Sequence, residues 1–394
     1  MTGLRFDTVI VRYGAEIGVK SSRTRASYDK LLIKNIRAKL EADGLGLEGI
    51  ERRYGRIYLK TSTPREVAQS LSRVFGISST SPAISCRADL DAISDVAVKL
   101  AEERGGRGVK FAVRCRRVGE HPFTSIDVAR HVGSKILEAM KCMEWHVDLD
   151  EPDFAVNIEV RDEEAFLFTE VVKGVGGLPL GSQGRVICLM SSGIDSPVAA
   201  WLMMRRGCPV TLLHFDLQKF SGEKTEEKVI DLAKALSKWS PAYEVRLIKV
   251  PFGDVLGEII KKCPRKLTCV LCKRMMIRIA ERIAIERKLL GIVTGDSVGE
   301  QASQTLSNMA AISEAAKRVP IYRPLLGFDK PETERIAREI GTYEISARPD
   351  EGCKAAPSRP STSVSVEKAI EAEKALDVTS LVEGVLKRAV ELRV

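Results

Sequence analysis

The feature that most constrains the fold is a short apolar run followed at once by a turn of small residues. Residues 186–190 are all apolar, which predicts a buried parallel strand. A Ser-Ser-Gly turn occupies residues 191–193, and Asp195 and Ser196 open a helix whose first turn tolerates Pro197. Unpaired backbone N–H groups and the positive helix end both point at such a turn. The stretch therefore predicts an anion-binding site at the end of a strand.

Strand and helix patterns alternate through the second half of the chain. They predict strands at residues 186–190, 210–215, 243–250 and 292–294, and helices at 197–206, 226–238 and 275–290. This alternation is typical of an α/β domain with a doubly wound parallel sheet. The glycine-rich segment 174–184 is predicted to be a linker, so we expect the domain to occupy residues 174–394.

The first part of the chain predicts a smaller α+β module. Strands are expected at residues 8–13 and 56–60, and helices at 27–40 and 64–74. The order β-α-β-α suits a ferredoxin-like module, which we expect to span residues 1–76.

A basic strand stands out in the next segment, residues 77–173. Residues 104–117 contain six basic side chains and no acidic one. Among them are Lys110, Arg114, Arg116 and Arg117, in a stretch where polar and apolar residues largely alternate. Such a strand suits the phosphate backbone of a nucleic acid, in line with the net charge of +9.

Composition excludes several other classes of protein. No apolar run is long enough to cross a membrane, and the N-terminus lacks the apolar core of a signal peptide, so we expect a cytoplasmic protein without membrane partners. The nine cysteines are an odd number, which argues against a secreted disulfide framework. Clustered cysteines in a reducing compartment are more often metal ligands or nucleophiles.

Several stretches together resemble one enzyme family. Residues 191–196 follow the pattern Ser-x-Gly-x-Asp-Ser, which resembles the PP-loop of ATP pyrophosphatases, with Ser192 in place of a usual glycine. Residues 110–125 resemble a THUMP domain. Residues 294–306 and 323–332 resemble two stretches of the tRNA 4-thiouridine synthetases, with Asp296 and Glu300 departing from them, Glu300 where the family carries an amide. The chain is similar to the rhodanese-free, archaeal form of that family.

The resemblance implies a fold and a set of site residues. It implies ferredoxin-like and THUMP modules before a PP-loop ATP pyrophosphatase domain, with Asp195 and Lys330 at the family's essential aspartate and lysine. ATP and Mg²⁺ are the implied cofactors. The residues expected to bind the nucleotide are Leu189, Met190, Ser191, Ser192, Gly193, Ser196, His214, Phe215, Lys273, Arg274, Gly295 and Gln304.

In PP-loop proteins the carboxyl edge of the sheet holds the nucleoside, so the resemblance implies that Phe215, at the end of its strand, stacks on adenine. His214 is expected to hydrogen-bond the ribose or base. Lys330 is expected to neutralise charge at the α-phosphate.

Cysteines supply the expected sulfur chemistry. Cys353 matches the family's catalytic cysteine, and the chain ends about forty residues later, without a rhodanese segment. Cys269 and Cys272 form a Cys-x-x-Cys expected at a helix N-terminus, which favours thiolates. With Cys353 they would supply three ligands of a [4Fe–4S] cluster, leaving one iron open. A thiol pair with a persulfide on Cys353, and a zinc site with Cys263 as fourth ligand, are the alternatives.

The expected function is that of an ATP-dependent tRNA sulfurtransferase that makes 4-thiouridine at position eight. The sulfur donor would be a cysteine desulfurase or inorganic sulfide, and the family implies a homodimer and a role in thiamine thiazole synthesis. Two other readings stay open. One is a PP-loop ligase or amidotransferase acting on a small molecule, and the other is a non-catalytic tRNA-binding protein.

Overall fold

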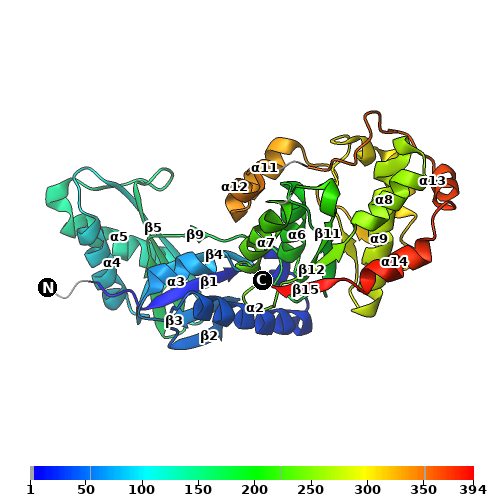
Figure 1. The fold of residues 1–394 in the computed structure, drawn as a ribbon. Helices are drawn as coiled ribbons and strands as arrows, with labels where there is room; N and C mark the ends of the chain where they lie inside the picture. The colour runs from blue at the N-terminus through cyan, green and yellow to red at the C-terminus, as the bar shows by residue number, and fades with distance from the viewer. Residues whose placement is uncertain (1–3, 54, 223, 350–351) are drawn as a thin grey trace. The chain divides into compact units, whose positions relative to one another are not determined.

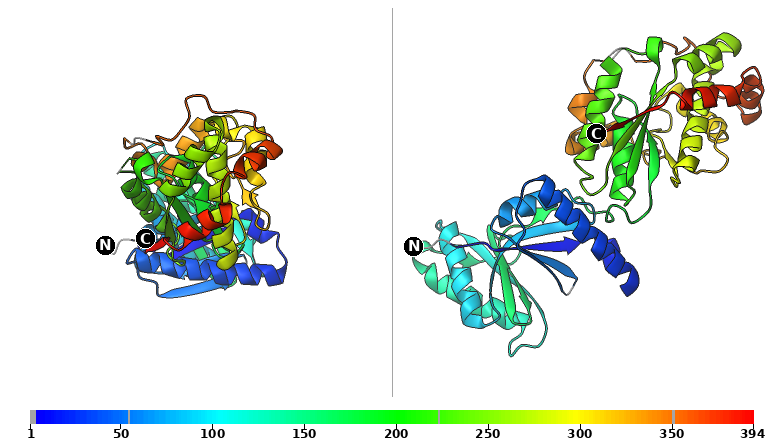
Figure 2. Two further views of the ribbon diagram at one scale, coloured as in Figure 1. Left: turned by 45° about the vertical axis from the view of Figure 1, so that its right-hand side comes forward. Right: turned by 60° about the horizontal axis from the view of Figure 1, so that its bottom comes forward.

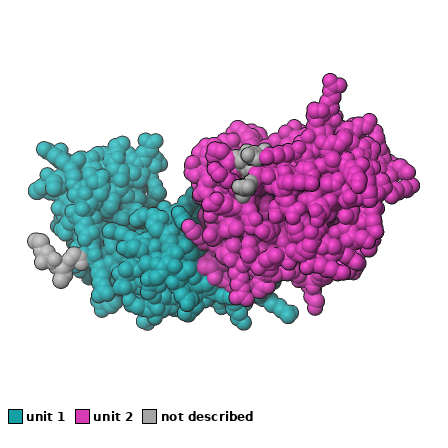
Figure 3. Space-filling view, in the orientation of Figure 1, with its two compact units in different colours: residues 1–178 teal, residues 179–394 magenta. Residues whose placement is uncertain are grey.

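The structure is a computed structural model that describes residues 4–53, 55–222, 224–349 and 352–394. The chain forms two compact units, residues 1–178 and residues 179–394, which Figure 3 colours separately. Each unit is built on one β-sheet of its own.

Unit 1 begins with the predicted ferredoxin-like arrangement. Its first four long strands are antiparallel and lie in the order β2-β3-β1-β4, with one long helix after β1 and another after β3. The elements are β1 (Thr8–Tyr13), α1 (Ala15–Gly18), α2 (Ser22–Ala42), β2 (Gly49–Arg53), β3 (Arg56–Lys60), α3 (Pro64–Leu71) and β4 (Ile77–Arg87). Strand β2 was not predicted, because its Gly-Ile-Glu-Arg-Arg sequence contains three charged residues and one large apolar residue.

The helices of this module cover one face of the sheet. Strand β1 alternates, so Val9 and Val11 join α2 and α3 in one core while Ile10 belongs to a core on the opposite face. Tyr58 of β3 lies on that opposite face as well. The sheet is therefore buried on both sides.

Strand β4 continues into the THUMP-like segment, so that both modules share one nine-stranded sheet. Its path is β2-β3-β1-β4-β8-β7-β5-β6, and β9 pairs with β4. The further elements are α4 (Leu90–Arg104), β5 (Lys110–Val118), α5 (Ser125–Ala139), η1 (Lys141–Met143), β6 (His146–Val147), β7 (Phe154–Arg161), β8 (Glu164–Phe168) and β9 (Val172–Lys173). Thr124 starts α5 through a capping box with Asp127.

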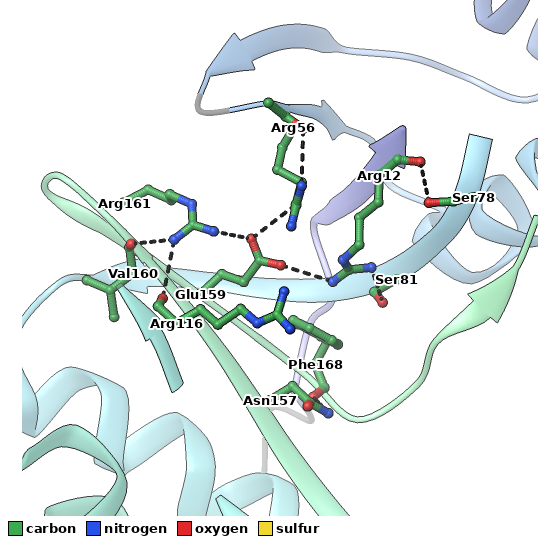
Figure 4. A network of polar contacts seen from close by, with 11 residues as sticks. Arg12, Arg56, Ser78, Ser81, Arg116, Asn157, Glu159, Val160, Arg161 and Phe168 are labelled. Atoms are coloured by element: carbon green, nitrogen blue, oxygen red, sulfur yellow. Dashed lines mark hydrogen bonds and ion pairs between the residues drawn. The ribbon is translucent and has the colours of Figure 1, made fainter. Parts of the chain in front are cut away.

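The shared sheet is strongly curved. Tyr58 of β3 stacks on Phe166 of β8 with ring centroids 4.5 Å apart, although two strands lie between them. In a flat sheet these strands would be about 14 Å apart. Beside the rings, Glu159 of β7 accepts hydrogen bonds from Arg12 at 3.2 Å and Arg161 at 2.6 Å (Figure 4). Glu159 is buried and also lies 3.7 Å from Arg56, so it ties β7 to β1 and β3.

Unit 2 is the predicted doubly wound α/β fold. Its six-stranded sheet has the order β14-β13-β10-β11-β12-β15, with every pair parallel except β12–β15. The strands are β10 (Val186–Leu189), β11 (Val210–Asp216), β12 (Arg246–Pro251), β13 (Ile292–Val293), β14 (Ile321–Tyr322) and β15 (Val390–Arg393). Strand β10 carries the predicted loop and lies inside the sheet, between β13 and β11.

Helices cover both faces of this sheet (Figures 1 and 2). One layer contains α6 (Asp195–Arg205), α7 (Lys224–Ser237), α11 (Lys330–Ile340) and α12 (Tyr343–Ser346). The other contains α8 (Gly253–Lys262), α9 (Thr268–Glu286), α10 (Leu306–Ser313), α13 (Val366–Glu373) and α14 (Val378–Leu386). Three short 3₁₀ helices precede α7, α9 and α10: η2 (Gln218–Phe220), η3 (Arg265–Leu267) and η4 (Ala302–Gln304). Searched over the described residues, the chain has no helix long and apolar enough to span a membrane.

Candidate functional site: a loop, a lysine and a thiol around one cavity

The loop after β10 is closed by the hydroxyl of Ser196. This hydroxyl accepts a hydrogen bond from the Ser191 N–H at 2.9 Å and donates to the Ser191 carbonyl at 3.2 Å. The Gly193 N–H donates to Ser191 Oγ at 3.4 Å, and Ser346 Oγ donates to the Gly193 carbonyl at 3.2 Å. The loop is thus pinned in place at the N-terminus of α6, where backbone N–H groups attract anions.

Gly295 packs directly against the start of α6. A Cβ placed on Gly295 would lie 2.9 Å from the carbonyl carbon of Asp195 and from the backbone nitrogen of Ser196. No side chain fits there without moving the helix backbone. The glycine predicted to approach the nucleotide therefore also allows the loop after β13 to approach the first turn of α6.

Two carboxylates hold the ammonium of Lys330. Lys330 Nζ lies 2.9 Å from Asp195 Oδ1 and 2.6 Å from Glu300 Oε1. Burial alone would lower the pKa of Lys330, but hydrogen bonds to Glu300 and Asp195 outweigh it and raise that pKa. Burial raises the pKa of Asp195, Lys330 opposes this, and the charge of Glu300 raises it further. The predicted lysine and aspartate do come together, with Glu300 as a third partner.

Asp296 is a buried carboxylate with several hydrogen-bond partners. It accepts hydrogen bonds from Lys273 Nζ at 2.9 Å, Thr294 Oγ1 at 2.7 Å and Gln304 Nε2 at 3.4 Å. Arg323 Nε lies 3.4 Å away. Burial alone would raise the pKa of Asp296, but the charge and hydrogen bond of Lys273 lead the contacts that lower it. Two predicted nucleotide-binding residues, Lys273 and Gln304, are therefore oriented by a carboxylate that the sequence marked only as a departure from its family.

His214 and Phe215 lie at the carboxyl end of β11, as predicted. The His214 Nδ1–H donates to the Met190 carbonyl at 3.0 Å, because a carbonyl can only accept. Burial lowers the pKa of His214, so the ring is neutral at pH 7 with Nε2 as an acceptor. Phe215 meets Phe252 edge to face at a centroid distance of 5.2 Å.

Most of these groups surround one cavity of about 340 Å³, although Gly193, Glu300 and Lys330 are not among the described residues that line it. Its lining includes the predicted residues Leu189, Met190, Ser191, Ser192, Asp195, Ser196, His214, Phe215, Lys273, Gly295, Gln304 and Cys353. Sequence reasoning missed Met276 and Ile277, which line the cavity from the same face of α9 as Lys273. Their i+3 and i+4 spacing from Lys273 was the available signal. It also missed Thr225 and Gln301, for which no sequence pattern gave a signal.

Arg274 corrects one prediction. Its side chain is fully buried and points away from the cavity, between α9, α10 and α13. It donates to Glu314 at 2.8 Å and to Glu373 at 2.7 Å. Because adjacent helical residues face different directions, only Lys273 of the pair reaches the cavity.

The Cys-x-x-Cys differs from expectation in two ways. Both cysteines lie inside α9, which starts at Thr268 rather than near residue 275, since Val270 and Leu271 are buried on its core side. Burial, reinforced by the nearby Cys353, raises the pKa of Cys269 and of Cys272. Desolvation therefore disfavours the thiolate forms that were predicted from the helix end.

The thiols do not form a metal site as they stand. Cys269, Cys272 and Cys353 lie near enough for their charges to interact. Cys263 faces elsewhere, with its Sγ 3.4 Å from the Ala372 carbonyl. Within the described residues, no group of three or more His, Cys, Asp or Glu side chains is placed to hold a metal ion.

In unit 1, the predicted basic residues all lie on β5. Arg114 and Arg116 are exposed, whereas Lys110 and Arg117 are half-buried. Lys110 pairs with Asp148 at 3.2 Å, and Arg117 donates to the Gly119 carbonyl at 2.8 Å. The exposed positive charge of the strand is therefore concentrated in its second half.

The fold and the cavity define the class of protein: an α/β nucleotide-binding domain with a PP-loop, joined to ferredoxin-like and THUMP modules. The model of the family described as thiamine biosynthesis protein (ThiI) matches residues 181–378. The THUMP domain and the ThiI ferredoxin-like domain match residues 87–170 and 8–81. The chain belongs to the ThiI family.

Similar proteins agree with this family. A protein of Methanosarcina acetivorans named "Probable tRNA sulfurtransferase" is 41% identical, over 97% of this chain and 92% of its own length. One of the same name from Methanothermobacter thermautotrophicus is 39% identical over 99% of both chains. A crystal structure of a 4-thiouridine synthetase–RNA complex with bound ATP has a TM-score of 0.88, 32% identity, and coverage of 99% of this chain and 100% of its own. The predicted family and fold class are confirmed.

Proposed function

We propose that this protein is an ATP-dependent tRNA sulfurtransferase that converts uridine to 4-thiouridine, at position eight of tRNA. One observation supports this most directly: the phosphate-binding loop and the Cys353 thiol line the same cavity. A nucleotide bound at the loop would hold an activated base within reach of a sulfur carrier. The names of its relatives and the RNA- and ATP-bound structural neighbour support the same activity.

The proposed reaction has two balanced steps. First, uridine O4 attacks the α-phosphorus of ATP, the bond to the β-phosphate oxygen breaks, and pyrophosphate leaves. Then a sulfur nucleophile adds at C4, the C4–O bond breaks, and AMP leaves with the original oxygen. The loop N–H groups would hold phosphate, and Lys330 would stabilise charge at the α-phosphate.

Mg²⁺ is part of the proposal. The Asp195 carboxylate lines the cavity at the loop and is an oxygen ligand of the kind Mg²⁺ prefers. Bound there, the ion would neutralise phosphate charge.

The sulfur step is assigned to the thiols near the cavity. Inorganic sulfide would supply the sulfur atom directly. A persulfide on Cys353, charged by a cysteine desulfurase, would add its outer sulfur to C4, and attack by Cys269 or Cys272 would then release the product and leave a disulfide. The described thiols do not fit a [4Fe–4S] or zinc site as placed, so the proposed sulfur transfer is not assigned to a cluster or to zinc. Iron and zinc analysis after anaerobic purification separates these forms.

We further propose a cytoplasmic homodimer. Transfer of sulfur to a thiamine thiazole precursor is a second activity suggested by the family's description, and it would use the same cysteines.

The test is a reconstituted reaction. Protein, ATP, Mg²⁺, tRNA and sulfide are expected to yield AMP, pyrophosphate and thiolated tRNA, measured by mass spectrometry of digested RNA. Pyrophosphate release that does not depend on tRNA would instead favour a ligase or amidotransferase of a small molecule. tRNA binding without any nucleotide turnover would favour a non-catalytic binding protein.

A further inference from the structure

Lys330 is shared between two carboxylates that come from different parts of unit 2. Asp195 is the first residue of α6, Lys330 is the first residue of α11, and Glu300 lies in the loop between β13 and η4. The ammonium is 2.6 Å from Glu300 and 2.9 Å from Asp195. The triad holds two negative charges and one positive charge, a net charge of the same sign as a triphosphate.

Only one member of the triad lines the cavity. Asp195 lines the cavity, but neither Lys330 nor Glu300 is among the described residues that line it. The ammonium is therefore held at the edge of the phosphate site. The two carboxylates use two of the three N–H donors of the ammonium and offset its charge. An α-phosphate would therefore bind the ammonium most strongly if a phosphate oxygen took the place of one carboxylate oxygen.

Glu300 is the partner that this exchange would release. Asp195 is the first-turn acid of α6, fixed at the phosphate loop itself, whereas Glu300 reaches the ammonium from a loop and contributes its charge from outside the cavity. A Glu300→Gln variant would place an amide at this position. An amide can accept a hydrogen bond from the ammonium but cannot compete with phosphate through charge.

We propose that Glu300 is a positioning residue that holds Lys330 at the cavity edge and competes with nucleotide phosphate for its ammonium. ATP binding then includes the cost of separating Lys330 from Glu300. After turnover, Glu300 takes the ammonium back and favours release of pyrophosphate. The inference rests on the proposed function, because it requires the loop to bind ATP.

The test measures binding of α,β-methylene-ATP, a non-cleavable ATP analogue, by calorimetry in the presence of Mg²⁺. Glu300→Gln is expected to bind it about two- to fivefold more tightly, the size of one part-exposed ion pair. Glu300→Ala is expected to show the same direction and guards against an effect of the new amide. Glu334→Gln, which removes a carboxylate from the same helix as Lys330 but outside the triad, is expected to bind like the wild type.

A double variant shows whether Glu300 acts through Lys330. In a Lys330→Met background, Glu300→Gln is expected to gain nothing, because no ammonium remains to be released. Direct repulsion between the part-exposed Glu300 and the phosphates is screened by salt, so it is expected to add little. Two results would overturn the inference while the ATP-binding function stands. One is an equal gain in affinity from Glu300→Gln in the Lys330→Met background, and the other is unchanged or weaker binding by both single Glu300 variants. Failure of the wild-type protein to bind the analogue would instead overturn both.

Discussion

At the scale of single residues, the chemistry of the site depends on how each charged group is paired. Asp296 illustrates this. Its residue type and sequence position do not reveal its role, whereas its four hydrogen-bond donors in the structure do. Its carboxylate orients Lys273 and Gln304 toward one cavity and lies buried among them. A buried carboxylate of this kind is costly to replace, since its partners would be left unpaired.

Asp296→Asn is expected to lower the free energy of unfolding by about 1–3 kcal/mol at pH 7 and to weaken ATP binding. The folded-state pKa of Asp296 is lowered, so its stabilisation is present above the unfolded value near 3.9 and is lost as pH falls through the lower folded value. Thermal melts of both proteins should therefore differ at pH 7 and converge in acid. The control is Asp254→Asn, which removes an exposed ion pair with Arg388. A difference that grows in acid would contradict the assignment.

With a cysteine desulfurase as the sulfur donor, Cys353→Ser is expected to abolish tRNA thiolation while tRNA-dependent adenylation and release of pyrophosphate continue. The reason is that the thiol lines the cavity but makes no hydrogen bond to the phosphate loop among the described contacts. Thiolated tRNA and pyrophosphate are measured in the same reaction. Cys263→Ser is the matched control, because its sulfur faces the Ala372 carbonyl, and it should thiolate normally. Loss of both products in Cys353→Ser would assign the thiol to nucleotide binding instead.

At the scale of elements, the site is made by the close approach of segments that follow different strands. The loop after β10 and the loop after β13 meet because β10 and β13 are parallel neighbours and end at the same edge of the sheet. Helix α11 brings Lys330 to that edge, and a capping box between Asp329 and Glu332 fixes the helix start next to it. Gly295 is where the backbones come closest.

Gly295→Ala is expected to weaken ATP binding by about tenfold or more and to destabilise the protein by about 1–3 kcal/mol, the usual cost of overpacking. The added methyl group would meet the backbone of Asp195 and Ser196, which can yield only by moving the start of α6. Nucleotide titration and thermal melts check both effects. Gly327→Ala is the control, since its added Cβ meets nothing within 4 Å. Wild-type affinity in Gly295→Ala would show that the loop tolerates the shift.

At the scale of the whole molecule, the predicted nucleotide site and the predicted tRNA-binding strand lie in different units. The cavity belongs to residues 179–394 and the basic strand β5 to residues 1–178. The curved sheet of unit 1 joins its two modules through β4 and through the buried Glu159, so the RNA-facing unit is expected to act as one body.

Combined Arg114→Gln and Arg116→Gln substitutions are expected to weaken tRNA binding without changing ATP affinity. Each lost phosphate contact should reduce the slope of log affinity against log salt by about one. Filter binding across a salt series measures the slope. The control pair is Lys30→Gln with Arg37→Gln, two exposed cations on α2. An unchanged slope would exclude β5 from the RNA contact.

Much of this architecture could be predicted because it depends on neighbours in sequence. Apolar runs, the cap at Thr124 and the small residues after β10 act over a few positions, so strands such as β3 were predicted with the observed bounds. Strand β2 was missed because it is charged and stays partly exposed beside β3. The first turns of α9 were missed because their burial depends on packing in the core of unit 2. The sequence by itself determined the phosphate loop, the alternating sheet and the family.

Only the tertiary structure decided which side chains meet. Lys330 pairs with an aspartate 135 positions earlier, Arg274 turns to Glu373 instead of the cavity, and burial raises the pKa of Cys272. No local pattern encodes these outcomes. They follow from the energy of desolvating a charge, which is set by everything packed around it.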